Sequence, residues 1–236
     1  MVWLVATVVP YAIVVVLASV MVRGTTLYVI ARGWAHLALW GARWICGIHS
    51  RVAGLANLPD GPAILLAKHQ SAWETLALPT IMPRPLAYVF KRELLYVPFF
   101  GWALGRLDMV HIDRSRQAEA FARVERQGSA LLAKGNWIIL FPEGTRTPRG
   151  RQGVYKTGGT RLAIATGAPV VPIAVTSARC WPRQAFLKRP GTIDVSIGPP
   201  ISPLGRKPAE LMGEVESWIE AEMRRLDPQA YGHGGN

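Results

Sequence analysis

The sequence predicts an α/β domain preceded by a membrane-associated segment of two helices. From about residue 50 onward, short apolar runs typical of strands alternate with segments of helical period. Before them, residues 2–22 form an almost unbroken apolar run. Two polar motifs, beginning at Lys68 and Phe141, each follow a strand-like apolar run. Because α/β sheets place their sites at strand ends, we expect the two motifs to serve one site.

The N-terminal apolar run has the length of a membrane helix. As a helix rising ~1.5 Å per residue, residues 2–22 would extend roughly 30 Å, and they either cross the bilayer or bend back into one leaflet. No Lys or Arg precedes the run, and it exceeds the ~7–15 residues of a signal-peptide core, so we do not expect cleavage. Arg23 and Arg32 follow it, which predicts that the body lies on the cytoplasmic face of the inner cell membrane.

A second helix is predicted over residues 25–48, with apolar residues on one face and three tryptophans, Trp34, Trp40 and Trp44. Taken alone, it could be a helix packed on the core. Because it follows a membrane-length run and is rich in Trp, we interpret it as an interfacial helix. The predicted organisation is a membrane anchor over 1–48, a catalytic domain over 49–226 and a flexible tail over 227–236.

Periodicity and Gly or Pro punctuation define the remaining elements. Predicted strands cover 51–54, 63–67, 86–90, 109–112, 137–141, 170–175 and 193–197. Predicted helices cover 73–78, 116–134, 157–166 and 208–226. Ser115 is the expected N-cap of the second of these helices, and Gly135 and Gly167 are expected to end the second and third.

The charge balance points to an anionic partner. Lys and Arg number 27 against 15 Asp and Glu, for a net charge of +12. Nucleic acid, lipid headgroups and a phosphorylated substrate would all fit this excess, but no zinc-finger spacing or RNA-binding signature is present, so we expect no nucleic-acid partner. A membrane surface also explains the apolar N-terminus. Two cysteines, Cys46 and Cys180, provide neither a disulfide framework nor a metal set.

The first motif offers a base and a carboxylate. His69 can take a proton near neutral pH, and Glu74 can orient its imidazole. Residues five apart do not face each other on one regular helix, so the pair requires a turn between a strand end and a helix beginning near Trp73. Alone, His69 could equally be a hydrogen-bonded structural histidine. Ser71 lacks a nucleophile elbow and is interpreted as a turn residue.

The second motif resembles an anion-binding loop. Gly144 lets the backbone approach an oxyanion, Thr145 donates a hydrogen bond, and Arg146 can hold a phosphate with two parallel bonds. Glu143 is expected to orient the loop or the acceptor hydroxyl. The alternative is an ordinary glycine turn with solvated charges. With the first motif, this loop suggests acyl transfer onto a phosphorylated acceptor.

A third element places Asp113 and Arg114 directly before the expected N-cap Ser115. A phosphate at that helix start would gain the Arg114 charge and the N-terminal amides. The alternative is a surface ion pair. The following element, Val170–Val175, carries no polar side chain and is expected to be a core strand shaped by its proline.

In this order the motifs resemble the glycerolipid acyltransferase family, whose central member is 1-acylglycerol-3-phosphate (lysophosphatidic acid) acyltransferase. The matching residues are His69 with Glu74, Arg114, the string Phe-Pro-Glu-Gly-Thr-Arg over 141–146, and Val171-Pro172, within a resemblance that extends over about 51–200. The family usually has Asp where Glu74 stands, and its second block usually has an aromatic residue near Asp108 or Val110. The resemblance implies an α/β fold with a mixed sheet flanked by helices, as in glycerol-3-phosphate acyltransferases.

The resemblance also implies a reaction. A fatty acyl group passes from acyl-carrier protein or coenzyme A to the 2-hydroxyl of lysophosphatidic acid, giving phosphatidic acid, with no metal or cofactor. His69 and Glu74 would be catalytic, and Arg114 and Arg146 would clamp the phosphate with help from Lys91. Two alternatives remain open: another acceptor, such as a lyso-ornithine lipid or lysophospholipid, and a non-catalytic membrane lipid-binding protein. Membrane lipids are expected partners; the sequence leaves the oligomeric state open.

Overall fold

The computed structural model describes residues 2–113 and 117–231. The chain forms two compact units, each built from two stretches of sequence. Unit 1 comprises Met1–Ile45 and Thr75–Ile138, and unit 2 comprises Cys46–Glu74 and Ile139–Asn236. The N-terminal helices therefore share a unit with the middle of the chain, whereas the sequence predicted a separate N-terminal anchor followed by one contiguous domain.

Unit 1 begins with two helices, α1 (Val2–Ala18) and α2 (Gly24–Cys46). The first is shorter than the apolar run that predicted it, because the chain turns after Ala18. Within the described part of the chain, no helix combines the length and the apolar character that a membrane span requires. The predicted membrane-length helix over residues 2–22 is therefore corrected to a helix of 17 residues followed by a turn.

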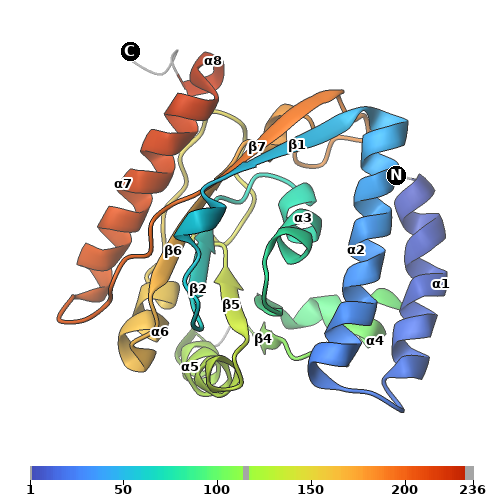
Figure 1. Cartoon of the computed structure of the whole chain (residues 1–236), viewed down its shortest axis with the longest axis horizontal. Coiled ribbons are helices and arrows are strands. Elements are labelled where there is room, and N and C mark those ends of the chain that lie inside the picture. The colour runs from blue at the N-terminus through green and yellow to red at the C-terminus, as the bar shows by residue number, and fades with distance from the viewer. Residues whose placement is uncertain (1, 114–116, 232–236) are drawn as a thin grey trace. The chain divides into compact units, whose positions relative to one another are not determined.

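The two N-terminal helices lie side by side (Figure 1) and are held by hydrogen bonds between tryptophan or tyrosine side chains and backbone carbonyls. The Trp3 indole N–H donates to the Leu37 carbonyl at 3.1 Å, and the Tyr11 hydroxyl donates to the Ile30 carbonyl at 3.1 Å. A Cβ atom at Gly41 would overlap the Trp3 indole. The absence of a side chain at this glycine therefore lets the helices approach closely.

The rest of unit 1 contains two parallel strands and several helices. The strands are β3 (Leu86–Lys91) and β4 (Val110–Ile112), and the helical segments are η2 (Arg92–Tyr96), α4 (Phe100–Leu104) and α5 (Gln117–Ala133). The two strands confirm sequence predictions, whereas η2 and α4 were not predicted. Helix α4 packs against α1 around a small apolar cluster that includes Val15 and Ala103.

Unit 2 holds a mixed sheet whose strands lie in the order β1 (Ile48–Ala53), β7 (Gly191–Ile197), β6 (Val170–Val175) and β2 (Ile64–Ala67). Strand β1 is parallel to β7, β6 is antiparallel to β7, and β2 is parallel to β6. Every residue of β2 and β6 is buried, as expected for strands covered on both faces. Strand β5 (Trp137–Leu140) crosses from unit 1 into unit 2.

Helices α6 (Gly158–Thr166) and α7 (Pro208–Leu226) flank this sheet, α6 against β2 and α7 against β6 (Figure 1). Helix α7 buries Leu211, Val215, Ile219 and Met223, which recur every fourth residue and so form one apolar stripe. Each such side chain contributes roughly 1.5–3 kcal/mol when it leaves water. Both helices begin or end within one residue of the bounds that the sequence predicted.

Residues 227–231, the last that the structure describes, form structure that the sequence did not predict. A short helix, α8 (Pro228–Tyr231), follows Asp227, which is buried and accepts two hydrogen bonds at 2.7 Å from the Arg149 guanidinium. Such a paired, buried carboxylate fixes the segment to the body of unit 2. Residues 227–231 of the predicted flexible tail are therefore held in place, through a long-range ion pair that no local pattern in the sequence predicts.

Candidate active site

The turn between β2 and α3 (Trp73–Ile81) carries the first motif, and hydrogen bonds within the motif shape it. The Glu74 carboxylate accepts from the backbone amides of Gln70 and Ser71, both at 2.7 Å, and the Ser71 hydroxyl donates to the same carboxylate at 2.9 Å. The Ser71 hydroxyl oxygen accepts in turn from the Trp73 amide at 2.8 Å. These reciprocal bonds follow the logic of a capping box at the start of a helix, and they confirm Ser71 as a turn residue.

The same turn pairs His69 with Glu74. The imidazole Nδ1 lies 2.8 Å from Glu74 Oε1, so the predicted strand–turn–helix geometry is confirmed. The Glu74 side chain is fully buried, whereas 14% of the His69 side chain is exposed. Burial raises the pKa of Glu74. Its hydrogen bond and charge interaction with His69 lower this pKa, as does the hydrogen bond from the Ser71 amide. Together they outweigh burial, so the pKa of Glu74 lies below its ordinary value.

An ionised Glu74 fixes the tautomer of the imidazole. A carboxylate without a proton only accepts hydrogen bonds, so His69 Nδ1 carries the hydrogen. The other ring nitrogen, Nε2, then holds a lone pair and is the atom that can remove a proton. The pair therefore has the composition and geometry of a general base with its orienting carboxylate.

Three residues of the second motif contact His69. The Phe141 ring stacks on the imidazole with centroids 3.9 Å apart and planes 15° apart. The His69 amide donates to Glu143 Oε2 at 2.9 Å, and the His69 carbonyl accepts from the Thr147 amide at 2.8 Å. The two polar motifs therefore meet, as their positions at strand ends predicted. Each contact involves a different residue of the loop, so the loop as a whole determines where the imidazole lies.

The centre of this loop is shaped for an anion. Gly144 has a φ of +67°, in the left-handed region that favours glycine, and its amide closes a turn on the Phe141 carbonyl at 2.9 Å. Arg183 donates to the Arg146 carbonyl at 3.0 Å and so supports the backbone of that residue. Within the described residues the Arg146 guanidinium has no hydrogen bond or ion pair, and Thr145 is exposed. Both side chains are available to a ligand.

Comparison with known proteins identifies this arrangement. Residues 49–176 match the family model described as Acyltransferase. The chain belongs to the acyltransferase family. It is 45% identical over 202 residues to the 1-acyl-sn-glycerol-3-phosphate acyltransferase of Pseudomonas aeruginosa, in an alignment covering 84% of this chain and 78% of that protein. The family resemblance inferred from the motifs is therefore confirmed.

The chain is also similar to more distant proteins. The alpha form of 1-acyl-sn-glycerol-3-phosphate acyltransferase from Mus musculus is 28% identical over 185 residues, which cover 77% of this chain and 65% of that protein. The crystal structure of the 1-acyl-sn-glycerophosphate (LPA) acyltransferase PlsC from Thermotoga maritima matches with a TM-score of 0.75, covering 93% of this chain and 90% of that chain at 24% identity. This match confirms the α/β fold.

Glu143 of the second motif contacts residues of the first motif. It is buried and both of its oxygens have partners: Oε2 accepts from the His69 amide, and Oε1 accepts from Lys68 Nζ at 2.6 Å. Burial raises the pKa of Glu143, and the Lys68 ammonium offsets part of that effect. We predicted a contact with substrate or loop orientation for Glu143; the observed contacts fit the second of these.

Sequence reasoning missed several residues around the acyltransferase motifs. Lys68, Glu220 and Tyr155 form one buried hydrogen-bonded cluster with Glu143, and Phe141 stacks on the base. A lysine inside an otherwise apolar strand end was the one available signal for Lys68. No local signal marks Glu220, which lies 152 residues further along the chain on α7.

The sequence also predicted phosphate contacts from Lys91 and Arg114. Lys91 is exposed at the end of β3 in unit 1. Arg114 and the expected N-cap Ser115 fall outside the described residues. Among the residues that the structure describes, no group of three or more His, Cys, Asp or Glu side chains could hold a metal ion.

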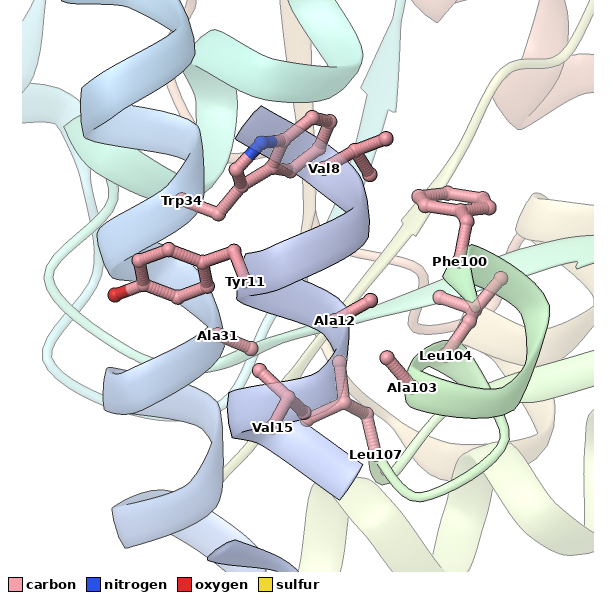
Figure 2. A pocket seen from close by; sticks show the side chains of 10 residues that line it. All are labelled: Val8, Tyr11, Ala12, Val15, Ala31, Trp34, Phe100, Ala103, Leu104 and Leu107. Carbon is pink, nitrogen blue, oxygen red and sulfur yellow. The ribbon is translucent and has the colours of Figure 1, made fainter. Parts of the chain in front are cut away.

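Unit 1 contains an apolar groove of about 90 Å³ between α1, α2 and α4 (Figure 2). Alanines 12, 31 and 103 leave space on its floor, and Trp34 and Phe100 form part of its wall. The polar atoms of the lining aromatics have partners elsewhere, since the Tyr11 hydroxyl bonds to Ile30 and the Trp34 indole N–H bonds to Thr7. The groove therefore presents carbon surface, which suits a hydrocarbon chain better than a polar ligand.

Proposed function

We propose that this acyltransferase moves a fatty acyl group from a thioester to the sn-2 hydroxyl of 1-acylglycerol 3-phosphate and so forms phosphatidic acid. The observation that carries the proposal is the His69–Glu74 pair, whose His69 contacts the same loop that leaves the Arg146 guanidinium without a partner in the described chain. A base and an unpaired guanidinium on two loops that contact each other fit an acceptor that has both a hydroxyl and a phosphate. The relatives named above carry names for this activity.

The reaction follows from the proton position on the imidazole. His69 Nε2 removes the proton of the acceptor hydroxyl as its oxygen attacks the thioester carbonyl. Glu74 stabilises the imidazolium that forms, because its carboxylate already accepts from Nδ1. When the carbon–sulfur bond breaks, the imidazolium returns its proton to the departing sulfur. The products are the new ester and a free thiol, and the enzyme is unchanged.

The charge distribution supports an acidic thioester carrier, either acyl-carrier protein or coenzyme A. Between Glu143 and Asp194 the sequence contains no acidic residue, while basic residues recur throughout. Among these, Arg151, Lys156 and Arg183 are exposed. Such a surface would attract either carrier, since both are anionic, and would raise the association rate more than the affinity. Parallel assays with both donors distinguish them.

We further propose that α1 and α2 rest in one leaflet of the inner membrane, with the catalytic residues on the cytoplasmic side. These helices expose many large apolar side chains, among them Val5, Leu17, Trp40 and Trp44. A soluble surface rarely carries so many. The apolar groove of unit 1 could accept the alkyl chain of a lipid that enters from the leaflet. Arg23 and Arg32 would then reach the headgroups.

The testing experiment is acyl transfer by the purified protein in mixed micelles with 1-acylglycerol 3-phosphate. Wild type should form phosphatidic acid, and His69→Ala should lose on the order of 10²-fold or more in turnover. Its fold should persist, because Glu74 retains two amide donors and the Ser71 hydroxyl. Equal rates in the two proteins would reject the mechanism. If wild type acylates a lyso-ornithine lipid and not 1-acylglycerol 3-phosphate, the proposed acceptor is wrong. Lipid binding without any turnover would favour a binding protein.

A further inference from the structure

Unit 2 buries the ammonium group of Lys68 next to the second motif, and each of its three N–H groups has an acceptor. Lys68 is fully buried, and its Nζ lies 2.6 Å from Glu143 Oε1, 2.6 Å from Glu220 Oε1 and 3.2 Å from the Arg151 carbonyl. An ammonium has three N–H donors, so these three acceptors use all of them. Its partners lie 75, 152 and 83 residues away in the sequence, respectively.

The cluster extends to the backbone of the proposed base. Glu143 joins the Lys68 ammonium through one carboxylate oxygen and the His69 amide through the other. The Glu143 carboxylate therefore accepts hydrogen bonds from two consecutive residues, from the side chain of Lys68 and from the main chain of His69. At the other end, Glu220 Oε1 also accepts from the Tyr155 hydroxyl at 2.8 Å. The unbroken sequence of contacts is Tyr155, Glu220, Lys68, Glu143 and the His69 amide.

We propose that Glu220 of α7 is a positioning residue for the acyltransferase reaction, acting through Lys68 and Glu143 on the His69 backbone. The inference rests on the proposed function, since His69 must be the base for its position to matter. Glu220 touches no substrate in this scheme. Its carboxylate determines where the ammonium lies, the ammonium determines where the Glu143 carboxylate lies, and that carboxylate holds the amide of the residue that removes the proton.

The charges explain why such an arrangement needs both acids. A buried ammonium with a single carboxylate would leave two donors to weaker neutral partners, and a buried carboxylate without its cation is costly. Charge-assisted bonds are also shorter and stronger than neutral ones. The 2.6 Å distances from Nζ to Glu143 and to Glu220 fit this class. Two such bonds define the ammonium position more narrowly than one.

The test compares Glu220→Leu, Glu220→Gln and Glu216→Leu in the micelle assay. Leu at 220 removes the acceptor, and we expect turnover per folded molecule to fall up to ~10²-fold with little change in the KM of either substrate. Gln keeps an acceptor oxygen of similar reach and should restore most of the turnover. Glu216, one turn earlier on α7, bonds at the surface to Gln152 at 2.6 Å, so its substitution is the matched control.

A second readout follows hydrogen exchange of the His69 amide in the folded proteins. Glu220→Leu should speed this exchange, because the Glu143 acceptor loses its restraint, whereas Glu216→Leu should not. A folded Glu220→Leu protein with wild-type turnover and unchanged exchange would overturn the inference, as would a rise in KM alone. A wild type that forms no phosphatidic acid, together with exchange that still responds to Glu220→Leu, would instead reject the proposed function and leave the structural coupling.

Discussion

The imidazole of His69 lies flat against the Phe141 ring, with the two centroids 3.9 Å apart and the planes 15° apart. This stack joins the first residue of the second motif to the proposed base of the first. Together with the in-plane bond from Nδ1 to Glu74, it restrains the ring in two perpendicular directions. Because the imidazole is held at its edge and on its face, its rotation is restricted and Nε2 points in a defined direction.

Removing the stacking partner should therefore lower turnover. We expect Phe141→Ala to reduce kcat by about 10-fold, because the imidazole regains rotation that must be lost again in the transition state. Phe141→Tyr retains the ring and should remain close to wild type. Steady-state kinetics at saturating acceptor, with thermal unfolding as a check of the fold, measure the effect. Equal kcat in the Ala and Tyr variants would show that the stack is incidental.

The length of Glu74 is the second testable feature. Its Oε1 atom accepts from His69 Nδ1 and from two backbone amides at 2.7–2.8 Å, while Oε2 accepts from Ser71. An Asp side chain is one methylene shorter and cannot reach the amides and the imidazole together from the same backbone. Glu74→Asp should therefore lower kcat by about 10-fold, although the family usually has Asp here. Full activity of this variant would mean that the turn adapts to the shorter side chain.

Stability should depend on acid through the same carboxyl. The pKa of Glu74 lies below its ordinary value of 4.5, so the unfolded chain binds more protons than the folded chain just below that pH. The stabilisation is present above pH 4.5 and is lost as the pH falls through the lower, folded pKa. Urea unfolding between about pH 5 and about pH 3 should show a shallower decline for Glu74→Gln than for wild type. Parallel curves would contradict the assignment.

Glu143 acts on the other side of this window. Its pKa is raised by burial, so ionising it costs stability as the pH rises above 4.5 toward the folded value. The two carboxyls therefore affect unfolding in opposite directions and in separate pH ranges. Confining the comparison to the acid side isolates the contribution of Glu74.

Local sequence patterns predicted much of the fold, but they did not predict the long-range polar contacts. Strand β6 and helix α7 have the predicted bounds, because continuous apolar runs and a four-residue apolar repeat mark them directly. Helix α4 is too short for periodicity to reveal it. The meeting of His69 and Glu74 followed from their spacing, whereas the Lys68–Glu220 pair joins residues 152 apart and no local pattern predicts it.

Membrane attachment can be tested at the turn between α1 and α2. Val20 and Met21 are 83% and 89% exposed, and this turn is where an inserted pair of helices would meet lipid. The double substitution Val20→Glu and Met21→Glu should reduce flotation with anionic vesicles by about 10-fold, because two charges must then leave water. Leu204→Glu, at a side chain 76% exposed before α7, is the control. Equal loss in both proteins would reject the proposed contact.

Arg146 provides the sharpest test of acceptor recognition. Its guanidinium has no partner among the described residues, while the supporting bond from Arg183 reaches only its carbonyl. Arg146→Ala should raise the KM for 1-acylglycerol 3-phosphate by about 10- to 100-fold and lower kcat less, since a hydrogen bond to a charged group contributes ~1.5–3 kcal/mol. Arg146→Lys keeps the positive charge and should recover part of the affinity. Recovery should be incomplete, because an ammonium cannot form the two parallel bonds of a guanidinium. Arg224→Ala, an exposed charge near the end of α7, controls for the change in net charge. If Arg146 binds the phosphate, the KM should rise only for the phosphorylated acceptor. An equal rise in the KM for a lyso-lipid without phosphate would show that Arg146 binds another group.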